Sequence, residues 1–359
     1  MSNDLPSSKA AASATVAGLG VGDFHDRWDQ LRQVAGLGEA ALADLIALLQ
    51  DEDSDWEARW FAARALAELN HPEVISALVE ALAAADDDDL RQAAAAALTH
   101  IGAPAIAALG KQMADPALRP IAVQALAQIP HLTTLPLLIE ATADPRPSVR
   151  AIALNALGPF ADPATWPVVE RGLRDPAAAV RAAALRGLLS LRSHVPLGQL
   201  VETLTPIVAD TDPSVAQQAI YALGRLTGLA ATAVLLRQLG DASQVLQPAV
   251  VQALLWQDND TALAGLITAW GALGRPAQVV LVQGLPSLTA QHLQTAVALE
   301  GWLRTLPKTP DHSLLRRHLV LALGEIGGAP TEPLLRSLLS DGDLGVRLHA
   351  EAALRQLQP

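Results

Sequence analysis

The chain has 359 residues, of which 51% are apolar but only 3% are aromatic, so Ala and Leu dominate the apolar content. It contains no Cys, which excludes disulfide bonds, thiolate metal ligands and a cysteine nucleophile. The formal net charge of −12 argues against a protein that binds nucleic acid through its phosphates, because such binding requires a basic surface.

Residues 1–22 are rich in Ala, Ser and Gly and lack the basic start and apolar core of a signal peptide. We therefore predict a disordered N-terminal tail over 1–22. No uninterrupted apolar window of about 18 residues follows it, so we expect no membrane insertion. Together with the lack of Cys, which fits a reducing compartment, this predicts a cytoplasmic location.

One pattern recurs along the rest of the chain. Its skeleton, Val-Arg-x-x-Ala-x-x-Ala-Leu, begins at Val149, returns at Val180 with Gly in place of the second Ala, and returns again at Val346. Weaker copies, mostly 31 residues apart, centre on Arg59, Arg91, Arg119, Ala216, Gln247, Gln278 and Arg316. A near-constant period of this length indicates tandem structural repeats.

Each repeat is predicted to be a pair of helices. In every copy the apolar residues lie at −1, +3, +6 and +7 from the Arg position, which is one stripe of a helix. A second amphipathic run lies between copies, for example from Glu73 to Ala84 and from Trp166 to Leu173. One pair cannot bury its stripe alone, so the pairs must stack. We predict an all-α, right-handed α-α superhelix of about ten two-helix repeats, forming one solenoid over 23–359, with a half-repeat near Arg27 as its N-terminal cap.

An Asp lies six residues before several of the Arg positions and is often followed by Pro. An Asp acceptor before a Pro fits the start of a helix, because the first helical position needs no N–H donor. We predict that these charges satisfy turn amides and link neighbouring repeats in a structural ladder of Asp53, Arg59, Asp144, Arg150, Asp175, Arg181, Asp341 and Arg347. A longer repeat around 279–315, with about seven additional residues, is expected to interrupt this ladder.

The solvent-facing stripe of the second helix should run through positions +1, +5 and +9, one turn apart. From Trp60 to Trp256 this stripe contains amides, Arg, Trp and the single Tyr but only one acid. Trp, Tyr and Arg often dominate interface energetics. We predict a partner-binding concave face that contains Trp60, Arg64, Gln124, Asn155, Arg186, Tyr221, Arg225 and Trp256. The alternative is that these are ordinary exposed helix residues.

No catalytic or metal-binding set is found. The nine His residues do not pair at the i, i+3 or i+4 spacing of a helix-borne metal site. The acidic run from Asp86 to Asp89 is interpreted as a solvated turn that helps to start a helix. We predict no catalytic residue, no metal and no cofactor, which favours a function other than catalysis.

The unit Asp-Pro-x-x-x-Val-Arg-x-x-Ala-x-x-Ala-Leu, strongest at 144–188 and 341–354, resembles the short HEAT-like repeat of phycobilisome lyases. The resemblance implies a HEAT-like solenoid. The few Lys, frequent Gln and several Trp also look like those of a cyanobacterial member. The sequence contains no His-Glu dipeptide, so it does not match the iron-binding pairs of the related deoxyhypusine hydroxylases.

Two functions follow from this resemblance and from the predicted face. The first is a non-catalytic scaffold or adaptor that binds a protein partner, for which the resemblance suggests a photosynthetic antenna component. The alternative is a bilin lyase or chaperone subunit, which would attach or remove an open-chain tetrapyrrole bilin on phycobiliproteins. Nucleic acid is not an expected partner, and the oligomeric state is left open.

Overall fold

The computed structural model describes residues 5–21, 23–69, 71–84, 87–288, 292–326 and 329–356. Over these residues it consists of α-helices joined by short 3-10 helices and turns, without strands, so the predicted all-α repeat fold is confirmed. The chain divides into two compact units, Met1–Leu191 and Arg192–Pro359. The sequence predicted one solenoid over 23–359.

Unit 1 contains six consecutive helix pairs: α1 (Leu5–Ala17) and α2 (Phe24–Ala35), α3 (Leu42–Gln50) and α4 (Trp56–Leu66), α5 (Pro72–Ala84) and α6 (Asp88–Ile101), α7 (Ile106–Gln112) and α8 (Arg119–Ala127), α9 (Leu135–Ala141) and α10 (Pro147–Leu157), α11 (Trp166–Gly172) and α12 (Ala178–Ser190). Unit 2 contains five: α13 (Leu197–Leu204) and α14 (Pro213–Gly224), α15 (Leu229–Asp241) and α16 (Gln247–Gln257), α17 (Asp260–Ala269) and α18 (Arg275–Gly284), α19 (His292–Thr305) and α20 (Pro310–Ile326), α21 (Glu332–Leu338) and α22 (Leu344–Gln356).

The even-numbered helices carry the repeated Arg position and bury the predicted stripe. In α4, for example, Ala58, Ala62, Ala65 and Leu66 are all buried, whereas Arg64 between them is exposed. The same four positions are buried in α6, α8, α14 and α20. The spacing of the apolar residues therefore sets which face of each even-numbered helix enters the core.

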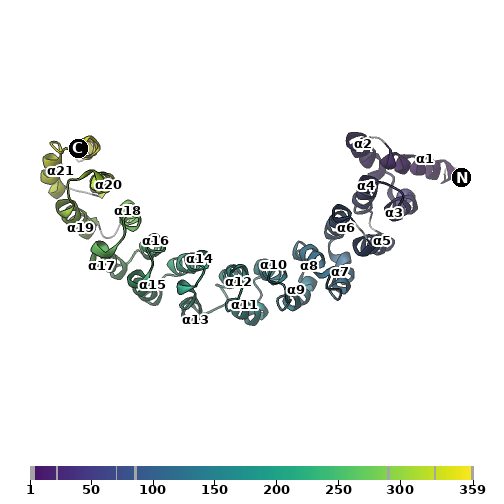
Figure 1. Cartoon of the computed structure of the whole chain (residues 1–359), viewed down its shortest axis with the longest axis horizontal. Coiled ribbons are helices and arrows are strands. Elements are labelled where there is room, and N and C mark those ends of the chain that lie inside the picture. The colour runs from purple at the N-terminus through teal and green to yellow at the C-terminus, as the bar shows by residue number, and fades with distance from the viewer. Residues whose placement is uncertain are drawn as a thin grey trace. The chain divides into compact units, whose positions relative to one another are not determined.

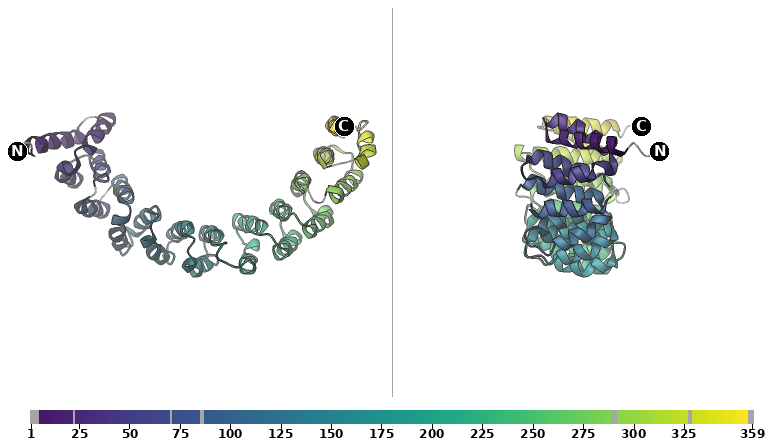
Figure 2. Two further views of the ribbon diagram at one scale, coloured as in Figure 1. Left: turned by 180° about the vertical axis from the view of Figure 1, so that it is seen from behind. Right: turned by 90° about the vertical axis from the view of Figure 1, so that its right-hand side faces the viewer.

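Within each unit the helices form two layers (Figure 1). The even-numbered helices pack on one another in succession within each unit, and most also pack on the odd-numbered helix of their own pair, as α4 does on α3 and α12 on α11. The row bends so that the even-numbered helices lie on its inner side in each unit, and Figure 2 shows the two layers from behind. The +1, +5 and +9 positions of the even-numbered helices therefore belong to the inner layer.

Small residues allow the inner helices to approach closely. A Cβ added to Gly224 in α14 would lie 2.8 Å from both the Cα and the Cβ of Ala253 in α16, closer than real Cβ contacts. Gly324 in α20 occupies the equivalent position, and its added Cβ would lie 2.7 Å from the Cβ of Ala353 in α22. The Ala-rich and Gly-containing composition thus follows from the short spacing between successive even-numbered helices.

The N-terminal segment differs from the predicted disordered tail. Residues 5–17 form α1, and Ala12, Val16 and Leu19 are buried against the following elements. Their spacing of four and three residues is a helical stripe, which the Ala- and Ser-rich composition concealed. Because α1 pairs with α2, the expected half-repeat near Arg27 is a full helix pair. Residues 1–4 and 22 lie outside the described residues.

The longer repeat predicted around 279–315 contains α19 and leads into the 17-residue α20, which begins at Pro310. Trp302 of α19 stacks on Trp270 of the preceding pair, with ring centroids 4.1 Å apart and planes 6° from parallel. Residues 289–291 lie outside the described residues. No single described helix has the length and apolarity to cross a membrane, although the bent pair Asp88–Ile101 and Ala103–Gln112 passes that test together.

Candidate functional site

The repeated Arg of the even-numbered helices fastens the turns between repeats. Nη1 of Arg150 donates to the carbonyl oxygen of Asp144, six residues earlier, at 2.9 Å. Its Nε and Nη2 donate to the two carboxylate oxygens of Asp175 at 2.8 Å each. Asp175 lies in the turn before the next even-numbered helix, where its Oδ1 also accepts from the backbone N–H of Ala177 at 2.9 Å. One Arg therefore closes its own turn and links it to the following repeat.

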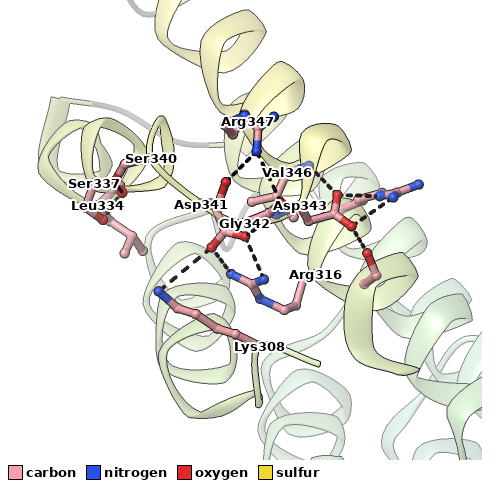
Figure 3. A network of polar contacts seen from close by, with 12 residues as sticks. Lys308, Arg316, Leu334, Ser337, Ser340, Asp341, Gly342, Asp343, Val346 and Arg347 are labelled. Atoms are coloured by element: carbon pink, nitrogen blue, oxygen red, sulfur yellow. Dashed lines mark hydrogen bonds and ion pairs between the residues drawn. The ribbon is translucent and has the colours of Figure 1, made fainter. Parts of the chain in front are cut away.

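The same arrangement recurs in unit 2 (Figure 3). Nη1 of Arg316 donates to Oδ1 of Asp341 at 2.9 Å, and a second contact joins Nη2 to Oδ2. Arg347 in turn donates to the backbone carbonyl of Asp341 at 2.7 Å. Lys308 lies 3.9 Å from the same carboxylate. The side chains of Arg316 and Asp341 are only 3% and 1% exposed, so this is a buried ion pair.

These contacts lower the pKa values of the turn carboxyls. Hydrogen bonds from Arg146 lower the pKa of Asp144 to about 2, against the opposing effect of burial, and Arg119 adds a contact at 3.2 Å. The Arg316 guanidinium likewise lowers the pKa of Asp341. For Asp175, burial raises the pKa, but the bonds from Arg150 and from the Ala177 N–H outweigh it, so the pKa is also lowered. The carboxylates of Asp144, Asp175 and Asp341 therefore keep their charge to a lower pH than an ordinary Asp.

The first member of the predicted ladder lies elsewhere. Asp53 is exposed in the turn after α3 and is not paired with Arg59. Arg59 instead donates from Nε to the carbonyl of Leu49 at 3.0 Å. The linking carboxylate is Asp55, whose two oxygens accept from Arg27 at 2.7 and 2.6 Å. The turn before α4 is shaped differently from that before α10, and this difference moves the acid two residues along the chain.

The role expected for Asp-Pro as a helix start is also corrected. Asp144 precedes the first residue of α10 by three positions and binds the backbone N–H of Arg146 at 2.8 Å, so it shapes the turn and is not the N-cap. The predicted cap geometry occurs instead at Asp212, whose side chain accepts from the N–H groups at the start of α14, with Pro213 as the first helical residue.

Where the repeat has Gln in place of Arg, neutral hydrogen bonds replace the ion pairs. Oε1 of Gln247 accepts from the backbone N–H of Gly274 at 2.9 Å, and Nε2 of Gln278 donates to the carbonyl of Trp270 at 3.1 Å. The charged ladder is thus interrupted in this part of unit 2, but the turns stay connected through amides.

The predicted binding residues of unit 1 lie on the exposed side of the inner layer. Arg64 is exposed, and its Cζ lies 5.1 Å from the ring centroid of Trp28 and 5.8 Å from that of Trp60. Trp28 and Trp60 are themselves 6.5 Å apart and pack with Phe24 and Phe61. Both distances from Arg64 are within the range of a cation–π interaction. Trp28 and Phe24 are functional candidates that the sequence analysis missed, although Trp28 occupies the same +1 position as Trp60.

A pocket of about 450 Å³ opens beside this cluster, between α4 and α6. Trp60 and Arg64 form one wall, and Ala93, Ala96 and Ala97 belong to its lining. The remaining lining residues are Ala67, Glu68, Gln92 and His100. Nε2 of His100 lies 3.4 Å from Oε1 of Glu68, so the acid at this end of the pocket has a partner.

The remaining predicted residues of unit 1 are also exposed. Gln124 lines a smaller hollow of about 120 Å³ between α6 and α8, and Gln92 and Ala96 border both hollows. Oδ1 of Asn155 accepts from Nε of Arg186 at 2.9 Å, so these two side chains are joined across α10 and α12. The structure therefore places all five predicted residues of unit 1 on the inner layer without bringing them into one cavity.

Unit 2 carries a second aromatic and Arg cluster. The rings of Tyr221 and Trp256 have centroids 5.3 Å apart, and Cζ of Arg225 lies 5.6 Å from the Trp256 ring. Gln217 contacts the hydroxyl of Tyr221 at 3.3 Å. Trp256 is 41% exposed, which is high for so large an apolar side chain.

A buried polar network was also missed. Nε2 of Gln257, the last residue of α16, donates to the carbonyls of Leu223, Gly224 and Leu226 at 3.1, 2.8 and 3.0 Å. Leu223 and Gly224 are the last residues of α14 and Leu226 follows them, so these carbonyls lie where a helix leaves acceptors without intrahelical donors. Gln257 therefore caps a neighbouring helix, a role that no local sequence signal indicated.

The acidic run near 86–89 behaves as a helix start in its described part. Asp87 is the N-cap of α6, and its Oδ1 accepts from the N–H groups of Asp89 and Leu90 at 2.7 and 3.1 Å. Asp86 lies outside the described residues. No group of three or more His, Asp or Glu side chains is arranged to hold a metal ion in the part of the chain that the structure describes.

Comparisons with known proteins agree with this geometry. Residues 14–99, 102–189 and 168–255 match the family model of HEAT repeats. No curated protein sequence matches the chain.

Three solved structures illustrate the similarity of fold. The karyopherin Kap121p, bound to the extreme C-terminus of the protein phosphatase Cdc14p, has a TM-score of 0.66 at 14% identity, covering 97% of this chain and 46% of its own. Kap95p, whose binding induces the switch loops of RanGDP to adopt the GTP-bound conformation, has 0.60 at 15%, covering 97% and 54%. Importin beta has 0.59 at 15%, covering 99% and 58%. The chain thus spans about half the length of these structures, and at such identities the similarity is one of fold.

Proposed function

Because the chain belongs to the HEAT-repeat family, we propose that it is a non-catalytic scaffold or adaptor that binds a protein partner along its even-numbered helices. The observation that carries the proposal is the pair of solvent-facing Arg and aromatic clusters, one in each unit, on the inner layer. Large aromatic side chains and Arg are the usual anchors of protein interfaces. The fold analogy adds support, since Kap121p binds the C-terminus of another protein.

The inner layer is suited to binding because its side chains are not needed for the core. The ladder carboxylates and Arg residues are engaged in the turns, whereas Arg64, Arg186 and Arg225 lie exposed on the opposite, solvent-facing stripe. A partner that covers these positions would bury Trp60 and Trp256, which are only partly buried in the free chain.

The test is affinity capture from native lysate, with identification of captured proteins by mass spectrometry. A variant with Arg186→Ala, Tyr221→Ala and Arg225→Ala is expected to lose the partner while keeping the helical circular dichroism signal. The matched control is Arg171→Ala with Arg237→Ala, which removes exposed Arg residues from the odd-numbered helices α11 and α15. Equal capture by all three proteins would contradict the proposed face.

The second candidate is a bilin lyase or chaperone subunit acting on an antenna protein, as the resemblance of the repeats suggests. The Arg-on-indole clusters favour it, because guanidinium groups can pair with propionates and indoles can stack on pyrroles. Purification in the presence of an open-chain tetrapyrrole tests it. A visible absorbance band that co-elutes with the chain and is lost in Trp60→Ala would support this function, and a colourless protein would exclude it.

A further inference from the structure

We propose that the pocket between α4 and α6 binds an acidic peptide segment of a partner protein, with Arg64 receiving a carboxylate. The inference deepens the proposed scaffold function and rests on it. It assigns to one pocket the chemical class of its ligand, which the fold alone does not specify.

The first step concerns the state of Arg64. Its guanidinium lies over Trp28 and Trp60, with Cζ 5.1 and 5.8 Å from their ring centroids. A guanidinium stacked on a ring directs its N–H donors outward in its own plane, where they match a carboxylate in two-point contact. Among the described residues no carboxylate is paired with Arg64, whereas Arg27, Arg150 and Arg316 each bind an Asp. Arg64 is thus a fixed cation with unused donors.

The second step concerns the space beside it. The pocket of about 450 Å³ is large enough for a few side chains of a peptide. The methyl groups of Ala93, Ala96 and Ala97 provide an apolar lining for an aliphatic side chain, and the amide of Gln92 can donate to and accept from a peptide backbone. Glu68, one turn from Arg64, contacts His100 at 3.4 Å and is not paired with Arg64, so the Arg64 donors remain available to an incoming carboxylate.

The third step is charge complementarity along the inner layer. At positions +1, +5 and +9 of the even-numbered helices in unit 1 the cations are Arg32, Arg64 and Arg186, of which Arg32 is paired with Asp29 at 3.3 Å, and the single acid is Glu68. This local excess of positive charge contrasts with the net charge of −12 of the chain. A basic segment would be attracted to the protein as a whole but repelled at this stripe, so an acidic segment is the better fit.

An Arg side chain also lies over an indole ring in unit 2. Arg225 lies over Trp256 at 5.6 Å, and Tyr221 packs against the same ring. This cluster uses positions +5 and +9 of its helices, whereas the cluster around Arg64 uses +1 and +5. The second cluster is therefore not a copied repeat motif. Two clusters built from different repeat positions both present Arg on an indole, which is the arrangement that the proposal requires.

The test measures binding of short fluorescein-labelled peptides to the full chain by fluorescence anisotropy at low ionic strength. Three peptides of equal length are compared: a Leu-Asp-Glu repeat, a Leu-Asn-Gln repeat and a Leu-Lys-Arg repeat. The acidic peptide is expected to bind most tightly. Arg64→Gln should raise its Kd by about tenfold or more, since a charge-assisted bond is lost. The matched control Arg171→Gln on α11 should leave the Kd unchanged.

Arg64→Lys provides a second variant, which keeps the charge and loses the planar donor pair, and its Kd should fall between those of the parent and Arg64→Gln. Thermal unfolding must be the same for parent and variants. Tighter binding of the basic or neutral peptide, or an Arg64→Gln variant with an unchanged Kd, overturns the acidic assignment. A chain that dimerises through this pocket, with the dimer lost in Arg64→Gln on gel filtration, also overturns it.

These outcomes separate the inference from the function on which it rests. If a neutral or basic peptide binds and Trp60→Ala abolishes that binding, the inner layer is still a protein-binding face and only the acidic chemistry is wrong. If no peptide binds and the inner-layer variants capture the same proteins as the parent, both the inference and the proposed function fail.

Discussion

The buried pair of Arg316 and Asp341 gives the sharpest test of how the repeats are held together. Arg316→Met removes the bidentate partner of the Asp341 carboxylate, which is 1% exposed, and leaves it the N–H of Asp343 at 3.1 Å and Lys308 at 3.9 Å. Removing one partner of a buried pair costs about 3–5 kcal/mol. Because tandem repeats are coupled mainly to their neighbours, we expect the loss to fall on α21 and α22, adjacent to the turn that contains Asp341.

A double variant removes the Asp341 carboxylate together with the Arg316 guanidinium. Arg316→Met with Asp341→Leu removes both charges, and such replacements are often neutral or stabilising. Nε of Arg316 is buried without a partner among the described residues, so the pair is not fully satisfied. The double variant loses the contact from Asp341 to the N–H of Asp343 at 3.1 Å, which is worth about 1 kcal/mol. We therefore expect it to lie within about 2 kcal/mol of the parent and above Arg316→Met.

Hydrogen exchange measured by mass spectrometry resolves the effect by helix. A local loss of about 3 kcal/mol should accelerate amide exchange in α22 roughly 100-fold in Arg316→Met, and unit 1 should be unchanged. The control Arg336→Met breaks an exposed pair with Glu332, of 64% and 41% exposure, and should change exchange little. Unchanged exchange in α22, or a double variant less stable than the single one, would refute the reasoning.

Three further predictions concern single positions. Since hydrogen bonds lower the pKa of Asp144 to about 2, its contribution is complete above the ordinary pKa and is lost as the pH falls from about 4 to about 2. At acid pH, the urea midpoint of Asp144→Asn should therefore depend less on pH than the midpoint of the parent. Gly224→Val should lower the free energy of unfolding in urea by about 1–3 kcal/mol, because the new side chain meets the α16 backbone. Gly301→Ala should raise it by about 0.5–1 kcal/mol, because the added methyl group has open space around it. Gln257→Leu should cost about 1–3 kcal/mol for each carbonyl left without a donor, and circular dichroism melts should detect it unless water enters the site.

The helical repeats could be predicted because their signal is periodic and local. The buried stripe of α4 and its exposed Arg64 follow from spacing alone. The helix α1 was missed because Ala and Ser give a weak hydrophobic contrast, although Ala12 and Val16 mark its buried side and Leu19 is buried just after it. Composition therefore misled where small and medium apolar residues carry the packing.

The contacts between repeats were less accessible from the sequence. The choice of Asp55 over Asp53 depends on how the chain turns between α3 and α4, which the repeat pattern does not encode. In the sequence, Gln257 is one more polar residue near a helix end. In the structure it is buried, and its amide donates to three carbonyls of the preceding repeat. Such roles depend on residues about thirty positions away and are visible only once the pairs are stacked.

The two sets of Arg residues show how the same side chain serves opposite purposes in this fold. On the core side of the turns, Arg150 and Arg316 are neutralised by Asp carboxylates whose lowered pKa values keep them charged, so these cations are unavailable to a partner. On the solvent-facing stripe, Arg64 and Arg225 rest on indoles, which hold the guanidinium in place without cancelling its charge. An aromatic support fixes the geometry of a cation while its donors stay free. Arg residues in the turns thus stabilise the stack, while other Arg residues on the inner layer remain charged and oriented toward solvent. This separation is the physical basis for proposing that the inner layer binds a partner.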